Sequence, residues 1–345
     1  MATERLMSPD DTPEDERAGN RLRPTTLPEY IGQSEVIERL TIAVEAGRRR
    51  GEAVEHVLFH GPPGLGKTTL AHVIAAEMQS SVHTTSGPAL ARGTDLVATL
   101  TRLEPNDVLF IDEIHRLPIA VEEFIYPAME DFRVDVTIET GLHAQTVQIE
   151  CKPFTLIGAT TRAGLLSAPL RSRFGLVHHL QFYSTDELVE IVSRSAGILG
   201  MDRSDGGALR LIAARSRGTP RIANRLLRRV RDFADVRTGG SVSERTVNAA
   251  LDLEGIDGEG LDAFDRAYMT AIAGTYQGGP VGVEAVAATL SEDSGTLEDV
   301  VEPYLLQRGF LARTRRGRML TDAGARHIGF SMPPASGVGD ASSMF

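Results

Sequence analysis

A chain of 345 residues is too long for one ordinary hydrophobic core, so two or three domains are expected. The single Cys151 excludes a disulfide framework or a cysteine-based metal site within one chain, and no run of about 18 apolar residues could span a membrane. The net charge of -11 argues against general coating of nucleic acid, and an acidic, polar N-terminus unlike a signal peptide makes the cytoplasm the expected location.

The first half of the chain has the pattern of an α/β domain. Residues 1–20 are rich in Asp, Glu and Pro, which predicts a disordered leader. Residues 21–182 then alternate strand-like and helix-like segments, as expected for a parallel sheet with helices on its faces. Short apolar runs predict buried strands at Val57–His60, Val82–Ser86, Val108–Asp112 and Thr155–Thr160.

A glycine-rich loop after the first predicted strand carries the strongest functional signal. Residues 61–68 read GPPGLGKT and fit the pattern G-x-x-x-x-G-K-[ST], and a helix is expected over Thr69–Met78. Such a loop aims backbone N–H groups at a polyphosphate, and the following helix N-terminus adds partial positive charge. The pattern predicts that Lys67 reaches the β/γ phosphates of ATP and that the Thr68 hydroxyl holds Mg²⁺.

An acidic pair at the end of another buried strand indicates hydrolysis rather than nucleotide binding alone. Four apolar residues place Asp112 at the strand end, beside the phosphate loop, where it can hold the water shell of Mg²⁺. Glu113 follows and is placed to polarise a water for attack on the γ-phosphorus. A kinase would not need this second carboxylate.

Three further residues have the chemistry of phosphate sensing. Thr161 follows the last predicted strand and could hydrogen-bond the attacking water or a γ-phosphate oxygen. Arg173 and Arg221 offer fork-shaped donors for charge that spreads over phosphate oxygens in the transition state. A lone arginine is more often a surface charge, so the motif context carries these two assignments.

The second half of the chain changes character. Residues 183–256 repeat apolar positions at helical spacing and predict a small helical domain, and Gly255–Gly260 is expected to serve as a linker. Residues 257–330 predict a winged helix: helices over Asp262–Thr275, Val283–Leu290 and Thr296–Gln307, then a hairpin with a basic turn over 310–320. Residues 331–345 are expected to be a disordered tail.

Charge is segregated toward this last domain. Residues 304–327 hold six arginines and one acidic residue, Asp322, opposite in sign to the whole chain. The predicted hairpin is therefore where a DNA phosphate backbone would bind.

Together these motifs resemble the AAA+ ATPases and, more narrowly, the RuvB family of Holliday-junction branch-migration motors. The resemblance runs from about Leu22 to Gly329 and includes the stretches 29–33, 84–88, 110–117, 126–132, 154–164, 218–234 and 300–306. It implies an AAA+ P-loop domain with a parallel sheet, a helical lid and a C-terminal winged-helix domain.

The resemblance also implies roles for individual residues. Gly64, Gly66, Lys67, Thr68 and Thr69 would hold phosphates and Mg²⁺, Asp112 and Glu113 would form the Walker B pair, and Thr161 would be sensor 1. Arg173 would be the finger that reaches a neighbouring subunit's ATP, and Arg221 would be sensor 2. Further residues match nucleotide-contacting positions of the family: Leu22, Arg23, Glu130, Asp131, Phe132 and Tyr183. Arg313 and Arg318 match its DNA-contacting arginines, and Arg316 belongs to the same basic wing.

A hairpin insertion is expected over residues 133–150. Val134, Val136 and Ile138 alternate with polar residues, Val147 and Ile149 alternate on the return side, and Thr140-Gly141 is a plausible turn. The resemblance implies that this hairpin binds RuvA. The chain departs from the family pattern at Glu139 and Gln145 near the hairpin tip and at Ser294 in the winged helix.

The resulting hypothesis is an ATP-driven motor for branch migration in recombination and DNA repair. The family assembles as a hexameric ring on double-stranded DNA and works at four-way junctions with RuvA and RuvC. Three alternatives share parts of the pattern: a clamp-loader-like switch, a DNA-binding regulator that uses ATP only as a ligand, and a sequence-specific replication initiator. Glu113 and Arg173 favour turnover, and the winged helix disfavours a clamp loader.

Overall fold

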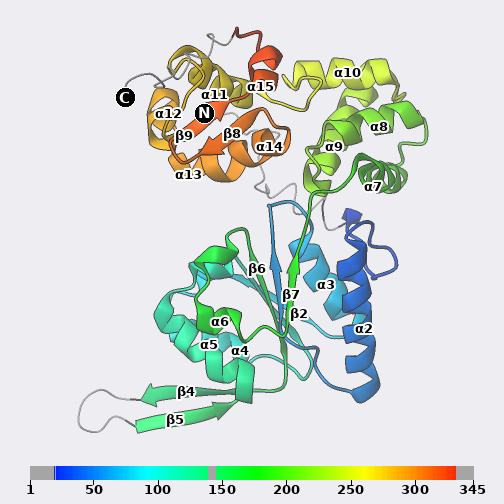
Figure 1. Ribbon diagram of the computed structural model, residues 1–345. Coiled ribbons are helices and arrows are strands. Elements are labelled where there is room, and N and C mark those ends of the chain that lie inside the picture. Colours follow the sequence, from blue (N-terminus) through cyan, green and yellow to red (C-terminus); the bar gives the residue numbers. More distant parts are fainter. Residues whose placement is uncertain (1–18, 20, 139–144, 332–345) are drawn as a thin grey trace, which may run out of the picture. The chain divides into compact units, whose positions relative to one another are not determined.

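The computed structural model describes residues 19, 21–138 and 145–331 (Figure 1). The predicted leader, the tail beyond residue 331 and the hairpin tip with Glu139 and Thr140-Gly141 lie outside the described residues, apart from Gly19. The described residues divide into two compact units, each described by itself: one holds those up to 202 together with 218–225, and the other holds 203–217 and 226–331. The predicted three-domain boundaries stay predictions. No helix of the described residues is long and apolar enough to cross a membrane.

The first unit is built on a five-stranded parallel sheet in the order β2-β3-β6-β1-β7. The strands are β1 (Val57–His60), β2 (Val82–Ser86), β3 (Val108–Asp112), β6 (Thr155–Thr160) and β7 (Leu176–His179). The first four have the predicted bounds. The predicted burial is confirmed for β1, β3 and β6 but is wrong for β2, in which no residue is buried. In β7 only His178 is buried, and half of its residues are histidines, so this edge strand lacks an apolar run that the sequence could reveal.

Helices cover both faces of this sheet, with α2 and α3 on one side and α4 and α5 on the other (Figure 1). They are α2 (Ser34–Arg50), α3 (Lys67–Glu77), α4 (Gly93–Leu100), α5 (Ile119–Asp131), the short α6 (Ala168–Arg171) and, further along, α7 (Thr185–Ile198). The predicted start of the helix after the phosphate loop was late by two residues. The helix begins at Lys67 because Gly66 adopts the left-handed conformation that ends the loop.

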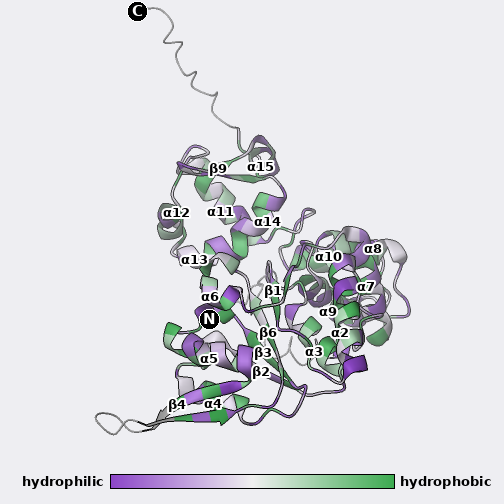
Figure 2. Ribbon diagram, turned by 60° about the horizontal axis from the view of Figure 1, so that its bottom comes forward, coloured by the Kyte–Doolittle hydropathy of each residue, from purple (hydrophilic) through white to green (hydrophobic). Residues whose placement is uncertain are grey.

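The insertion over 133–150 is an antiparallel hairpin, as predicted. Strands β4 (Arg133–Ile138) and β5 (Gln145–Glu150) pair with Val134 opposite Ile149 and Val136 opposite Val147. Hydrophobic and hydrophilic residues alternate along it, which Figure 2 shows. Val134 packs into the core that α4 and α5 share with the sheet, whereas Val147 is exposed.

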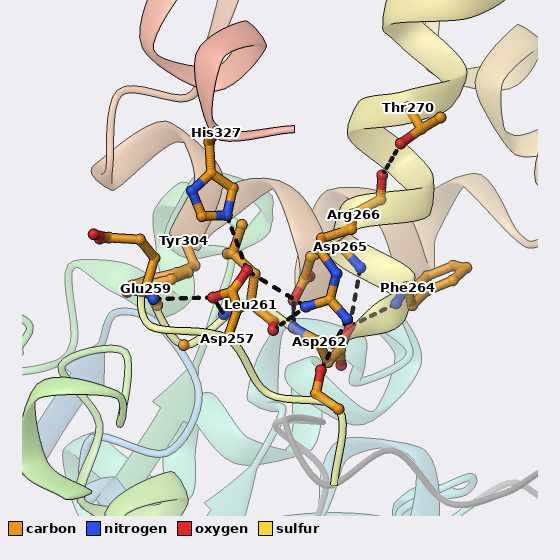
Figure 3. Close-up of polar contacts among 12 residues, drawn as sticks. Asp257, Glu259, Leu261, Asp262, Phe264, Asp265, Arg266, Thr270, Tyr304 and His327 are labelled. Atoms are coloured by element: carbon orange, nitrogen blue, oxygen red, sulfur yellow. Dashed lines mark hydrogen bonds and ion pairs between the residues drawn. The ribbon is translucent and has the colours of Figure 1, made fainter. Parts of the chain in front are cut away.

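The second unit contains α8 (Gly206–Ala214), α10 (Glu244–Leu253) and the C-terminal winged helix, and most of α9 (Pro220–Arg237). Its segment from Gly255 to Gly260 was expected as a linker, but it is an ordered, hydrogen-bonded loop (Figure 3). Asp257 accepts from the backbone N–H groups of Glu259 and Leu261, each at 2.9 Å, and bonds His327 at 2.9 Å.

The winged helix has α11 (Ala263–Gly274), α12 (Val283–Leu290), a third helical segment, the hairpin β8 (Leu311–Thr314) and β9 (Gly317–Leu320), and α15 (Asp322–His327). The predicted helix over Thr296–Gln307 is confirmed as a helical segment that ends at Gln307, but it begins two residues earlier, at Ser294, and contains a π-helical turn. The segment is α13 (Ser294–Thr296), a π-turn (Leu297–Val301) and α14 (Glu302–Gln307). Pro303 has no N–H to give the preceding turn, so the helical ladder widens there. The final α15 was not predicted.

Candidate active site

The phosphate loop wraps back on itself between β1 and α3. Gly61, Gly64 and Gly66 have φ of 137°, 80° and 98°, a region that side chains with a Cβ rarely adopt. A Cβ on Gly66 would lie 2.4 Å from the hydroxyl of Tyr30. The loop is also tied to the neighbouring strand, because Gly61 N–H donates to the Thr160 carbonyl of β6 at 3.2 Å.

Two tyrosines hold the tip of this loop. The Tyr183 hydroxyl donates to Tyr30 at 3.1 Å, and Tyr30 donates to the Leu65 carbonyl at 3.3 Å. Burial raises the pKa of Tyr183 to about 12, so both groups stay protonated donors at neutral pH. The sequence assigned Tyr183 to the nucleotide site but gave Tyr30 no role, although Tyr30 lies in the matched stretch 29–33.

Lys67 is the buried cation of the loop, with 8% of its surface exposed. Its ammonium donates to the carbonyls of Gly61 at 2.9 Å and Pro62 at 2.8 Å. The pKa of Lys67 is lowered to about 8, mainly by burial and with a smaller contribution from the charge of Arg221, while Asp112 and Glu113 oppose the shift. These carbonyls can be exchanged for phosphate oxygens, which are the stronger partners of an ammonium.

The acidic pair stands where the sequence placed it, at the carboxyl end of β3. The Asp112 carboxylate accepts from the Glu113 N–H at 2.9 Å, and Glu113 itself adopts a left-handed φ of 46°. Its carboxylate pairs with Arg116 at 2.8 Å and is partly exposed. Glu113 therefore stands at a strained turn with Arg116 beside it, a neighbour that sequence reasoning did not single out.

The end of β6 is fixed by a threonine that the sequence did not single out. The Thr160 hydroxyl, 1% exposed, bonds His115 Nδ1 at 2.9 Å and accepts from the Arg162 N–H at 3.0 Å. His115 comes two residues after Glu113, so this bond ties the two strand ends together. Thr161, the predicted sensor, follows directly and is half-buried.

Arg221, the predicted sensor 2, contacts the phosphate loop, and the N-terminal segment lies near α3 and α7. The backbone N–H of Arg221 donates to the Gly64 carbonyl at 3.4 Å, and a Cβ on Gly64 would touch the Arg221 side chain at 3.2 Å. Leu22 is buried, and its carbonyl accepts from Arg194 of α7 at 2.8 Å. Burial and the nearby charge of Arg23 lower the pKa of His72 on α3. Arg221 thus touches the loop itself, whereas Leu22 and Arg23 lie beside the helices α7 and α3.

Four of the predicted residues lie at the other end of the sheet, where the strands begin. They are Glu130, Asp131, Phe132 and Arg173. The Met129 carbonyl accepts a hydrogen bond from His56 Nε2 at 3.0 Å, and the Phe132 ring packs edge-on to His56. His56 precedes β1, whereas the phosphate loop follows it. The four residues of β1 span about 13 Å. Glu130, Asp131 and Phe132 are therefore separated from the phosphate loop of their own chain.

Arg173 belongs to this second group. Its Nε lies 3.1 Å from a Glu130 carboxylate oxygen, as an ion pair rather than a hydrogen bond. Its Nη1 donates to the Pro169 carbonyl at 2.8 Å, and its guanidinium carbon lies 4.3 Å from the centroid of the Tyr126 ring. The site residues thus form two sets, one at the carboxyl ends and one at the amino ends of the strands of the sheet.

Some arginines of the basic wing form ion pairs with glutamates of the same domain, and others lie at the exposed turn of the hairpin. Arg318 donates to Glu302 at 2.8 Å and to Glu298 at 2.6 Å, and Arg313 donates to Glu302 at 2.5 Å. The Glu302 carboxylate is fully buried; burial raises its pKa, but hydrogen bonds from Arg318, Tyr268 and Arg313 outweigh this and hold the pKa below its ordinary value. Arg315 and Arg316 are exposed at the turn between β8 and β9.

A phosphate loop after β1, an acidic pair on β3 and a threonine after β6, in this strand order, define a P-loop ATPase of the AAA+ class. Among the described residues no group of three or more His, Cys, Asp or Glu could hold a metal. The donor set that Thr68 and Asp112 offer is nevertheless the hard-oxygen type that suits Mg²⁺ beside phosphates.

Three family models match successive parts of the chain: the Holliday junction DNA helicase RuvB P-loop domain over 22–180, the RuvB AAA lid domain over 183–257 and the RuvB C-terminal winged-helix domain over 258–329. The chain belongs to the RuvB family, the motors of Holliday-junction branch migration. This decides against the clamp-loader, regulator and initiator alternatives.

Solved structures agree. The chain is 51% identical to the Thermotoga maritima RuvB Holliday junction branch migration motor, with 91% of this chain and 100% of that chain covered and a TM-score of 0.83. Two single-residue mutants of the same T. maritima protein are each 50% identical with a TM-score of 0.84. Both comparisons cover 90% of this chain, with 100% and 99% of the other.

Proposed function

We propose that the ATPase site of this motor is composite: one subunit binds ATP with its phosphate loop, and the neighbouring subunit supplies Arg173. The observation that carries the proposal is the position of Arg173 at the amino edge of the sheet, beside Glu130 and away from the loop that follows β1. Glu130, Asp131 and Phe132 share that edge, so the same neighbour presents them. A closed ring satisfies every site in this way, and a hexamer is the expected form.

Within one site, each residue has a separate task. Gly64, Gly66, Thr68 and Thr69 cradle phosphates with Lys67, and Leu22, Arg23 and Tyr183 hold the nucleotide. Glu113 orients the attacking water, Thr161 contacts water or γ-phosphate, and Arg221 and Arg173 bind charge that develops on phosphate oxygens. Mg²⁺, held by Thr68 and through water by Asp112, would neutralise the phosphates.

Loss of the γ-phosphate removes a shared ligand of Arg173 and Arg221, which changes how the subunits contact each other around the ring. The winged helices hold the duplex by phosphate contacts from Arg313, Arg316 and Arg318, which suits a motor that must pass any sequence. The β4–β5 hairpin, with Val147 exposed, is the proposed RuvA contact, and RuvC is the expected resolving partner in the cytoplasm.

Mixed rings test the composite site. Lys67→Ala and Arg173→Ala should each abolish ATP-driven migration of a four-way junction in the presence of RuvA. Mixing the two variants should restore ATPase activity, because some sites then combine an intact loop with an intact Arg173. Rings shown to be mixed that give no rescue at any ratio would exclude a finger acting between subunits.

A further inference from the structure

Arg173 rests on a platform that none of the assigned site residues explains. The guanidinium carbon lies 4.3 Å from the Tyr126 ring centroid, which is within the range of a cation–π contact. Tyr126 belongs to α5, and Arg173 lies two residues beyond α6. The two residues are 47 positions apart, so this contact exists only in the folded chain.

The Tyr126 ring is held in place by the buried carboxylate of Glu122. The Tyr126 hydroxyl donates to Glu122 at 2.7 Å, and the Ser167 hydroxyl donates to the same carboxylate oxygen at 2.5 Å. Glu122 is only 5% exposed. A buried charge needs its hydrogen bonds, so Glu122 fixes both hydroxyls in place.

The same lock fixes the segment that carries Arg173. Ser167 is the N-cap of α6 and accepts from the Leu170 N–H at 3.3 Å. The Pro169 carbonyl in this short helix accepts from Arg173 Nη1 at 2.8 Å. Glu122 therefore determines the position of the ring under the guanidinium and of the backbone behind it.

We propose that Tyr126, locked by Glu122 and Ser167, is the positioning residue for the arginine finger. The proposal rests on the composite site above. Tyr126 and Pro169 hold the guanidinium through its face and Nη1 while 22% of the Arg173 side chain stays exposed. An arginine held this way meets the neighbour's phosphate without first losing the freedom of a long side chain. None of the Tyr126 contacts described above involves the phosphate loop of the same subunit.

This predicts an asymmetry. Tyr126 should matter in the subunit that donates Arg173 and not in the subunit that binds the ATP. Tyr126→Leu removes the ring, and Tyr126→Phe keeps the ring but loses the bond to Glu122. In uniform rings we expect Tyr126→Leu to lower kcat about 10- to 100-fold with KM for ATP within about twofold, and Tyr126→Phe to have a smaller effect.

Mixed rings separate the role of Tyr126 in the subunit that donates Arg173 from any role in the subunit that binds ATP. In the parent pair, the mixture of Lys67→Ala and Arg173→Ala subunits described above, the Lys67→Ala subunit supplies Arg173 to the ATP site of the Arg173→Ala subunit. Adding Tyr126→Leu to the Lys67→Ala donor should cut the restored ATPase by the same 10- to 100-fold, about what misplacing a catalytic group costs. Adding Tyr126→Leu instead to the Arg173→Ala acceptor should leave the rescue unchanged.

The outcomes are separable. Equal loss in both arms, or no loss in the donor arm, overturns the positioning role while the composite site stands. Absence of rescue in the parent pair overturns the composite site and this inference with it. Nucleotide affinity and ring assembly of each double variant are measured first, and Tyr126→Phe provides the same comparison should Tyr126→Leu fail to assemble.

Discussion

At the residue scale, the charge of Lys67 depends on pH within the range near neutrality. Most lysines titrate far above neutral pH, but burial brings the pKa of this one to about 8. Its two loop carbonyls accept hydrogen bonds from either protonation state, so they do not hold the proton firmly. A triphosphate, in contrast, binds the ammonium form far better than the neutral amine.

The lowered pKa gives a pH dependence with a definite sign. Below pH 8 the ammonium is already present, and ATP binding should be nearly independent of pH. Above pH 8 the free site is mostly neutral, so binding must take up a proton and affinity should fall by up to about tenfold per pH unit.

Calorimetry in buffers of different ionisation enthalpy measures this proton uptake directly. Lys67→Arg is the matched control, because a guanidinium does not titrate in this range and should show no uptake. Proton uptake equal in both proteins would assign the dependence to another group.

At the scale of the element, the third segment of the winged helix anchors the hairpin that follows it. Glu302, the first residue of α14, is fully buried and receives hydrogen bonds from Arg318, Arg313 and Tyr268. Its pKa lies below the ordinary value of 4.5, so its contribution to stability is complete at neutral pH and is lost as the pH falls through the acid range.

Breaking this buried network should loosen the wing. Glu302→Gln leaves Arg318 short of a buried partner and should cost about 3 kcal/mol. Glu298→Gln removes a partly exposed partner of the same arginine and should cost at most about 1 kcal/mol. Hydrogen exchange of the β8–β9 amides in the full chain measures both. Equal protection in the two variants would contradict the anchoring role.

The helices and strands also show which parts of the fold could be predicted from the sequence. The strands β1, β3 and β6 were predictable because buried parallel strands are rich in continuous apolar residues, and the phosphate loop because its spacing is tightly constrained. The edge strand β7 and the π-turn before α14 depend on neighbours and on Pro303 within an otherwise regular helical pattern. The contacts of Tyr126 with Arg173 and of Thr160 with His115 join residues distant in sequence, and no local pattern encodes them.

On the scale of the whole molecule, charge is segregated by task. The chain carries a net charge of -11, yet residues 304–327 hold six arginines. An acidic body repels DNA, so the wing becomes the place where a phosphate backbone is favoured. Within the wing, Arg318 has a side chain only 12% exposed and pairs with Glu302, whereas Arg315 and Arg316 are exposed at the turn.

This division predicts different effects for two arginines in one hairpin. Arg316→Ala should weaken duplex binding equally on unrelated sequences and reduce the slope of log affinity against log salt by about one unit per wing in contact. Arg318→Ala should also lower hydrogen-exchange protection of β9, because it removes a partner of buried Glu302, and Arg316→Ala should not. Binding is measured over a range of salt concentrations on two duplexes of different sequence. A loss confined to one sequence would mean that the wing reads bases, which a motor passing along any DNA cannot afford.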